Sequence, residues 1–152
     1  MLLSDGFLAT AAERLKSDAL SEPQLRRAIS DMYFGMFHVI CETLASKVLA
    51  DDIAATKEAW LRLYRLPDHG TVAKACDDGR VSEFPREIGQ FAAQYKALKT
   101  KREDADYNGA AQFKSSEVRT TLQLVNSAVQ AFNMCDPDKK YAFAVFVALK
   151  RR

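Results

Sequence analysis

The longest predicted helix lies in the segment SEPQLRRAISDMYFGMFHVICETLASKVL, residues 21–49. We expect the helix to begin at Pro23 and to end near Leu49, because the four residues from Ser21 to Gln24 are typical of a capping box with a first-turn proline. The apolar residues recur every three or four positions, as the buried face of a helix requires. They are Leu25, Ile29, Met32, Met36, Ile40 and Leu44.

Helical periodicity extends over most of the remaining chain. Further helices are expected at about residues 6–20, 57–65 and 71–76, from Ser82 or Pro85 to about residue 108, and after a cap at Ser115 or Ser116. Asp136 and Pro137 are typical of a cap and a first helical residue. The apolar run at 141–149 could form a buried strand, but no second strand would pair with it. We therefore predict an all-α, mostly antiparallel bundle of about five main helices, with residues 1–152 as one domain.

The composition is typical of a soluble globular protein with a real core. The 152 residues are 48% hydrophobic and 28% charged, and the formal net charge is only +2. That charge is too small to indicate a nucleic-acid binder, so any such site has to be a local patch. Two candidate patches are present. They comprise Arg62, Arg65 and Lys74, and the run Lys96, Lys99, Lys101 and Arg102.

Three cysteines, Cys41, Cys76 and Cys135, are widely spaced and form no CxxC pair. Two isolated histidines do not complete a zinc ligand set, so we predict reduced thiols, no metal and no cofactor. The N-terminus lacks the basic start and apolar run of a signal peptide, and no stretch is long enough to span a bilayer. We therefore expect a cytoplasmic protein without membrane association.

The segment WLRLYRLPDHG, residues 60–70, contains one of the two histidines of the chain. Arg62 and Arg65 project from one face of a helix, and Pro67 and Gly70 place His69 at a predicted bend. Arginine binds phosphate through two parallel N–H groups, and histidine transfers protons near neutral pH. This cluster could bind and cleave a phosphodiester, or it could be a helix end with solvated charges.

Three segments resemble the HEPN domain superfamily, a group of small α-helical proteins of prokaryotes. Residues 25–38, LRRAISDMYFGMFH, resemble its second helix, and Arg102-x-x-Ala105-Asp106-Tyr107 resembles a pattern that recurs in the group. Between them, residues 60–69 resemble a family segment in which a histidine follows an arginine. The segments occur in the family's order and cover roughly half of the chain.

The resemblance implies a helical bundle that forms a homodimer and, for many members, a metal-independent endoribonuclease acting as a toxin or defence effector. The family signature leaves about four to six residues between an arginine and the histidine that follows it. Arg62 and His69 fit this spacing, whereas Arg65 lies too close to His69. Leu63 departs from the family, because many active members have a polar residue directly after the arginine. Thr71 stands where members modified by a partner nucleotidyltransferase have a tyrosine.

The predicted catalytic residues are Arg62, Arg65 and His69. His69 would be the general base for a ribose 2′-hydroxyl, and an arginine would stabilise charge on the phosphate. Lys74 and Arg102 are predicted RNA-binding residues, although Arg102 could equally form a surface ion pair with Asp106. The alternative is a non-catalytic HEPN-like module that binds a nucleotide or a protein partner, such as an antitoxin or an effector. A plain structural dimer is the third possibility.

Overall fold

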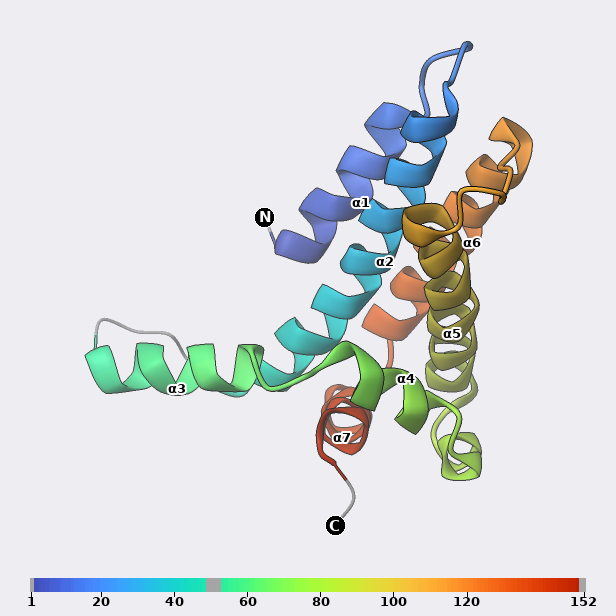
Figure 1. Ribbon diagram of the computed structural model, residues 1–152. Helices are drawn as coiled ribbons and strands as arrows, with labels where there is room; N and C mark the ends of the chain where they lie inside the picture. The colour runs from blue at the N-terminus through green and yellow to red at the C-terminus, as the bar shows by residue number, and fades with distance from the viewer. Residues whose placement is uncertain (1, 49–52, 151–152) are drawn as a thin grey trace.

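The computed structural model describes residues 2–48 and 53–150, and within these ranges the chain contains seven α-helices, one short 3-10 helix and no strand (Figure 1). The α-helices are α1 (Leu3–Arg14), α2 (Glu22–Ala45), α3 (Ala54–Tyr64), α4 (His69–Cys76), α5 (Arg86–Tyr107), α6 (Ser115–Asn133) and α7 (Pro137–Ala148). The 3-10 helix η1 spans Gly79–Glu83. The predicted all-α class is confirmed, and the seven α-helices correspond to the five main ones expected together with the shorter ones expected at 57–65 and 71–76.

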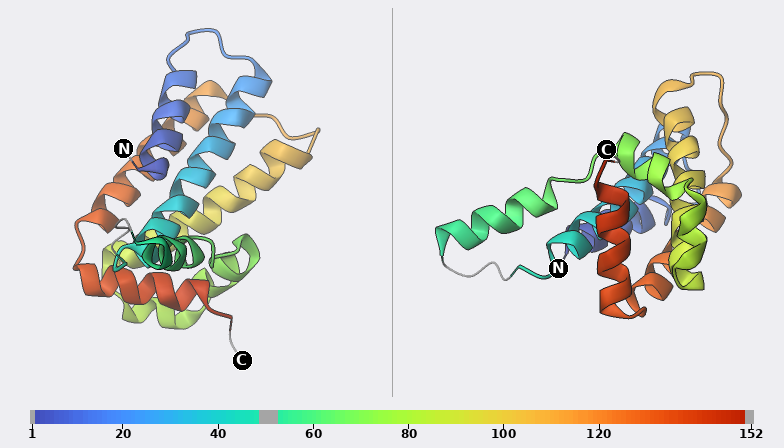
Figure 2. Two further views of the ribbon diagram at one scale, coloured as in Figure 1. Left: turned by 90° about the vertical axis from the view of Figure 1, so that its left-hand side faces the viewer. Right: turned by 90° about the horizontal axis from the view of Figure 1, so that it is seen from below.

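Helix α2 lies at the centre of the fold and packs against α1, α3, α5, α6 and α7. Helices α1, α2, α5 and α6 run along the length of the molecule, and α1–α2 and α5–α6 are each joined by a loop at the same end (Figures 1 and 2). Helices α3 and α7 instead lie across the opposite end, where α3 extends away from the body (Figure 2). The predicted antiparallel arrangement therefore describes the long helices and not the crossing ones.

The apolar residues predicted for the buried face of α2 form a stripe that lies in the middle of the core. All six of its residues are 3% exposed or less, because helices on several sides cover them. Aromatic rings fill the space between α2 and the helices beyond it. Phe91, Phe132 and Phe143 are fully buried and contact one another, with ring centroids 4.5–6.3 Å apart. The spacing read from the sequence thus identifies the residues that hold the fold together.

Several helix ends differ from the predictions. Helix α1 spans Leu3–Arg14 rather than 6–20, and no side chain caps its first residue, which is why the sequence gives no start signal there. Helix α6 begins at Ser115 itself, so neither Ser115 nor Ser116 is its cap; Lys114 holds that position. Helix α2 ends at Ala45, earlier than expected, and the predicted end at residue 49 lies outside the described residues.

Other signals are confirmed. Ser21 and Gln24 form the predicted capping box, and the Asp136 side chain caps α7 with Pro137 as its first residue. The apolar run that could have been a strand is helical, and it includes Phe143 in the core. Local cap chemistry therefore predicts the start of α7 correctly and the start of α2, at Glu22, to within one residue.

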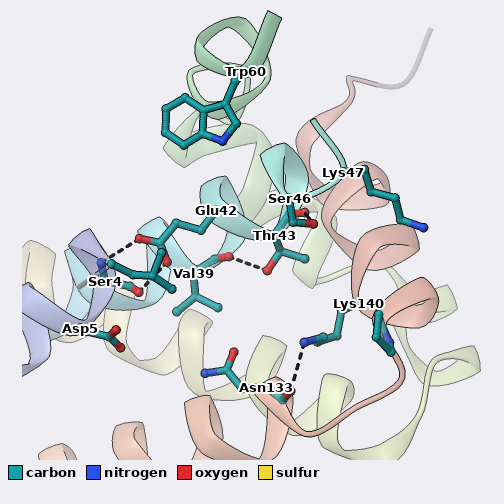
Figure 3. Close-up of a pocket in the computed structure, with 12 residues that line it drawn as sticks. Ser4, Asp5, Val39, Glu42, Thr43, Ser46, Lys47, Trp60, Asn133 and Lys140 are labelled. Atoms are coloured by element: carbon teal, nitrogen blue, oxygen red, sulfur yellow. Dashed lines mark hydrogen bonds between the residues drawn. The ribbon is translucent and has the colours of Figure 1, made fainter. Parts of the chain in front are cut away.

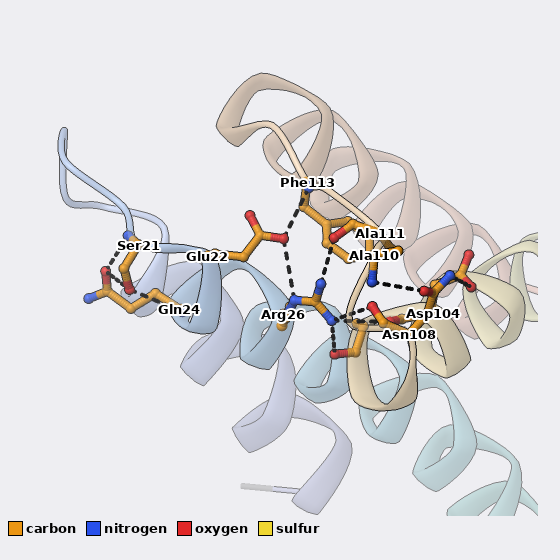
Figure 4. Close-up of polar contacts among 10 residues, drawn as sticks. Ser21, Glu22, Gln24, Arg26, Asp104, Asn108, Ala110, Ala111 and Phe113 are labelled. Atoms are coloured by element: carbon orange, nitrogen blue, oxygen red, sulfur yellow. Dashed lines mark hydrogen bonds and ion pairs between the residues drawn. The ribbon is translucent and has the colours of Figure 1, made fainter.

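Arg26 on α2 joins the end of α5 to the loop that follows it (Figure 4). Its Nη1 atom donates to the carbonyl oxygens of Asp104, Ala105 and Asn108 at 3.2, 2.9 and 3.0 Å. Its Nη2 atom donates to the carbonyl oxygen of Ala111 at 2.6 Å. The guanidinium thus satisfies carbonyls that the end of a helix leaves without an intrahelical partner. Through it the segment at 25–38 contacts the segment at 102–107.

Candidate functional site

His69 is the first residue of α4, so the predicted bend is in fact a helix start, two residues before the expected one. Asp68 caps this helix, because its Oδ1 atom accepts from the Thr71 backbone N–H at 2.9 Å and its Oδ2 atom accepts from the Thr71 hydroxyl at 2.7 Å. The cap directs the chain after Pro67 into a new helix, and it places the His69 ring against the side of α2.

The His69 ring is half-buried among aromatic side chains of α2. Its Nδ1 atom lies 2.7 Å from the hydroxyl oxygen of Tyr33, and that oxygen lies 3.0 Å from the hydroxyl oxygen of Tyr95. The ring stacks on Phe37 with centroids 3.9 Å apart. Among the described residues no hydrogen bond is made to Nε2. One nitrogen is therefore anchored to the protein interior, while the other is open to a ligand.

The charges that act on His69 come from α5 and from its own cap. Burial lowers the pKa of His69, and the positive charges of Arg102 and Lys99 lower it further, whereas Asp68 opposes them. Burial and Arg102, the two largest influences, thus outweigh Asp68 and favour a neutral imidazole at neutral pH. A neutral histidine beside two cations can approach an anionic ligand without a charge of its own.

Arg102 lies on α5 next to this ring system. Its guanidinium carbon is 5.2 Å from the centroid of Tyr33, the residue that holds His69, and 5.6 Å from the centroids of Phe34 and Tyr107. Its Nε atom is 2.8 Å from Asp106 Oδ2, but this N–H is not directed at the carboxylate and makes no hydrogen bond among the described residues. Arg102 therefore pairs with Asp106, as considered, and it also lies against Tyr33, the tyrosine bonded to His69; RNA binding by Arg102 stays a prediction.

The other predicted site residues lie on exposed surfaces. Arg62 is ion-paired with Glu58 one turn earlier on α3, and its side chain is 79% exposed. Arg65 is the exposed C-cap of α3, and Lys74 is exposed on α4. None of the three is among the charges that shift the pKa of His69. The cations that do so are Arg102 and Lys99 on α5, and Lys99 is itself ion-paired with Glu103.

Sequence reasoning missed Tyr33, Tyr95 and Phe37 as neighbours of His69. Tyr33 and Tyr95 are fully buried, and in the sequence they look like ordinary members of apolar helix faces. A polar hydroxyl on such a face was the available signal, because a buried tyrosine needs a hydrogen-bond partner. The sequence does not say that the partner comes from α4.

The second histidine and the cysteines have structural environments. His38 Nδ1 lies 2.6 Å from the Tyr64 hydroxyl oxygen, and its ring stacks on Phe7. Burial, followed by the nearby His69, lowers the pKa of His38. Burial raises the pKa of Cys76 to about 12, so this thiol is not an activated nucleophile for His69.

A pocket of about 590 Å³ lies on a different part of the surface, between the N-terminal turn of α1, the end of α2 and the start of α7 (Figure 3). Glu42 lines it and accepts from the backbone N–H of Ser4 at 2.9 Å and from the Ser4 hydroxyl at 2.6 Å. Trp60 faces it from α3. None of the predicted site residues lines this pocket.

The described part of the chain shows neither a metal-binding cluster nor a membrane-spanning helix. No group of three or more histidine, cysteine or acidic side chains is arranged to hold a metal ion in residues 2–48 and 53–150. Over the same ranges, no helix combines the length and the apolar character needed to cross a bilayer. Comparison with models of protein families, with curated proteins and with solved structures finds no match to this chain.

Proposed function

We propose that the protein is a HEPN-type, metal-independent endoribonuclease with His69 at its centre. The observation that carries the proposal is the His69 ring itself, with Nδ1 anchored by Tyr33, with no partner for Nε2 among the described residues, and with the positive charges of Arg102 and Lys99 acting on it. A proton-transfer group next to cations is the minimum that cleavage of an RNA phosphodiester requires. The resemblance of three sequence segments to HEPN domains supports the same reaction.

In the proposed reaction the ribose 2′-oxygen attacks the adjacent phosphorus, and the bond from phosphorus to the 5′-oxygen breaks. The 2′-hydroxyl proton passes to His69, and the departing 5′-oxygen takes up a proton from the site or from water. The products are a 2′,3′-cyclic phosphate and a 5′-hydroxyl. Arg102 and Lys99 would offset the negative charge that builds up on the phosphate.

Arg62 and Arg65 have a separate part in this proposal. Arg62 lies in the last turn of α3 and Arg65 is its C-cap, and both are exposed. In a homodimer, exposed arginines of one subunit can reach the phosphate held at His69 of the other, and the local density of positive charge then exceeds that of a monomer with a net charge of +2. Lys74, exposed on α4, would contact the RNA backbone.

The test compares wild type with His69→Ala on labelled tRNA and mRNA in excess EDTA, with analysis of the product ends. Loss of a proton-transfer group should slow cleavage by about 10²–10⁴-fold. His38→Gln is the matched control, because it alters the other histidine, and thermal melts verify that both variants fold. Intact RNA with wild type, under conditions in which a control nuclease cuts, would refute the proposal.

One observation favours a second candidate, a non-catalytic module that binds a nucleotide or a protein partner. Leu63 packs against the core at the position where many active HEPN proteins have a polar residue, and Arg62 is already paired with Glu58. This candidate predicts that wild type and His69→Ala leave RNA equally intact. His69-dependent cleavage with cyclic phosphate ends would exclude it.

A further inference from the structure

The hydrogen bonds behind His69 form a short chain of only three groups. The hydroxyl oxygen of Tyr95 lies 3.0 Å from that of Tyr33, which lies 2.7 Å from Nδ1 of His69. Both tyrosines are 0% exposed, so water does not reach their hydroxyl groups. Tyr95 makes no hydrogen bond with any other described residue through its side chain. The hydroxyl protons of Tyr33 and Tyr95 must therefore find their acceptors within this chain of three groups.

Only one arrangement uses both hydroxyl protons. If Tyr95 donates to Tyr33 and Tyr33 donates to His69, each O–H has an acceptor, and Nδ1 accepts without a proton of its own. In the opposite direction His69 Nδ1–H donates to Tyr33 and Tyr33 donates to Tyr95. The Tyr95 proton is then buried without an acceptor, which folded proteins avoid.

We infer that Tyr33 and Tyr95 hold neutral His69 in the tautomer that carries its proton on Nε2, so that the open nitrogen meets a ligand as a hydrogen-bond donor. The acceptor that fits is a phosphate oxygen, an assignment that rests on the proposed function; the tautomer does not depend on it. In this state His69 has no lone pair to offer at Nε2. Tyr33 is thus a positioning residue, and His69 can accept the 2′-hydroxyl proton at Nε2 only after its own proton has moved to Nδ1, which then donates to Tyr33.

The charged groups around the ring agree with a neutral, donating histidine. The positive charges of Arg102 and Lys99 on α5, which are paired with Asp106 and Glu103, act on it, as do Asp68 of its own cap and His38 on α2. The two α5 cations disfavour an imidazolium, as does the hydroxyl chain, because a protonated Nδ1 would reverse both donors and leave the Tyr95 proton without an acceptor.

The experiment is ¹⁵N NMR of protein labelled in its two histidines, near pH 8, with His38→Gln used to assign the His69 signals. The inference predicts that Nε2 carries the proton and that Nδ1 has the chemical shift of an unprotonated, hydrogen-bonded nitrogen. A protonated Nδ1, or a mixture of the two tautomers, would overturn it. The spectrum of the wild-type protein alone decides this, whether or not RNA is cleaved.

A second readout is the direction of a pKa change in Tyr33→Phe, which removes one oxygen and keeps the ring. Because the Tyr33 proton stabilises neutral His69, its loss should raise the pKa of His69 by about half to one pH unit. If Nδ1 were the donor instead, the same substitution would lower it, and an unchanged or lowered value refutes the inference. An inactive wild-type protein with the predicted tautomer would refute the ribonuclease alone.

Discussion

Replacing Arg26 with alanine should destabilise the protein more than any other single change at a charged residue of α2. The Arg26 side chain is 19% exposed and donates to four backbone carbonyl oxygens at the end of α5 and in the following loop. Water can reach part of this region, so each lost bond should cost about 0.5–1 kcal/mol, at the low end of the usual range. The sum is a loss of about 2–4 kcal/mol in the free energy of unfolding.

Urea denaturation followed by circular dichroism measures this loss, and Arg27→Ala is the matched control. Arg27 is the next residue on the same helix, and it is exposed. Its removal should change the free energy of unfolding by no more than about 0.5 kcal/mol. Arg26→Lys should keep only part of the stability that Arg26 provides, because one ammonium group cannot reach all four carbonyl oxygens. If Arg26→Ala and Arg27→Ala unfold at the same urea concentration, the joint between α2 and α5 contributes nothing and the reasoning fails.

Further predictions concern pH, thiols and the core. The pKa values of His38 and His69 both lie below the ordinary 6.5, so the unfolded chain binds more protons. The free energy of unfolding should therefore keep its full value above about pH 6.5 and decrease as the pH is lowered through that value. Urea titrations at pH 7.5 and pH 5 measure the difference, and equal free energies at the two pH values would contradict the prediction. In native protein Cys135, the least buried thiol, should react first with a disulfide reagent, and rapid reaction of all three cysteines would count against the fold. Phe143→Ala should cost about 3–5 kcal/mol, whereas Met134→Ala, at a side chain 82% exposed, should be nearly neutral in thermal melts.

The sequence predicts the helices that carry strong periodic or capping signals. The stripe of α2 is confirmed because a helix buried on its long face needs apolar residues every three or four positions, and Asp136 marks the start of α7 because a cap is a local interaction. The ends of α1 are missed, since no side chain caps its first turn. Local signals thus predict elements better than they predict ends that depend on tertiary packing.

The surroundings of His69 show the same limit. The sequence singles out the histidine, but its partner Tyr33 lies 36 positions away and the next hydroxyl, of Tyr95, comes 62 positions after Tyr33. Nothing in residues 60–70 indicates that Arg102, rather than Arg62, supplies the charge beside the ring. Contacts between distant helices depend on the whole fold, and with one sequence they can be proposed only by resemblance.

Helix α3 differs from the rest of the fold in how it is held. None of its described residues is buried, and it packs chiefly against α2, where Tyr64 bonds to His38. The free energy of opening this helix alone must therefore be well below that of global unfolding, and its amide hydrogens should exchange first among those of the helices. Arg62 and Arg65 accordingly stand on an element that can be reoriented, by a partner or by RNA, while the core around Met36 keeps its packing.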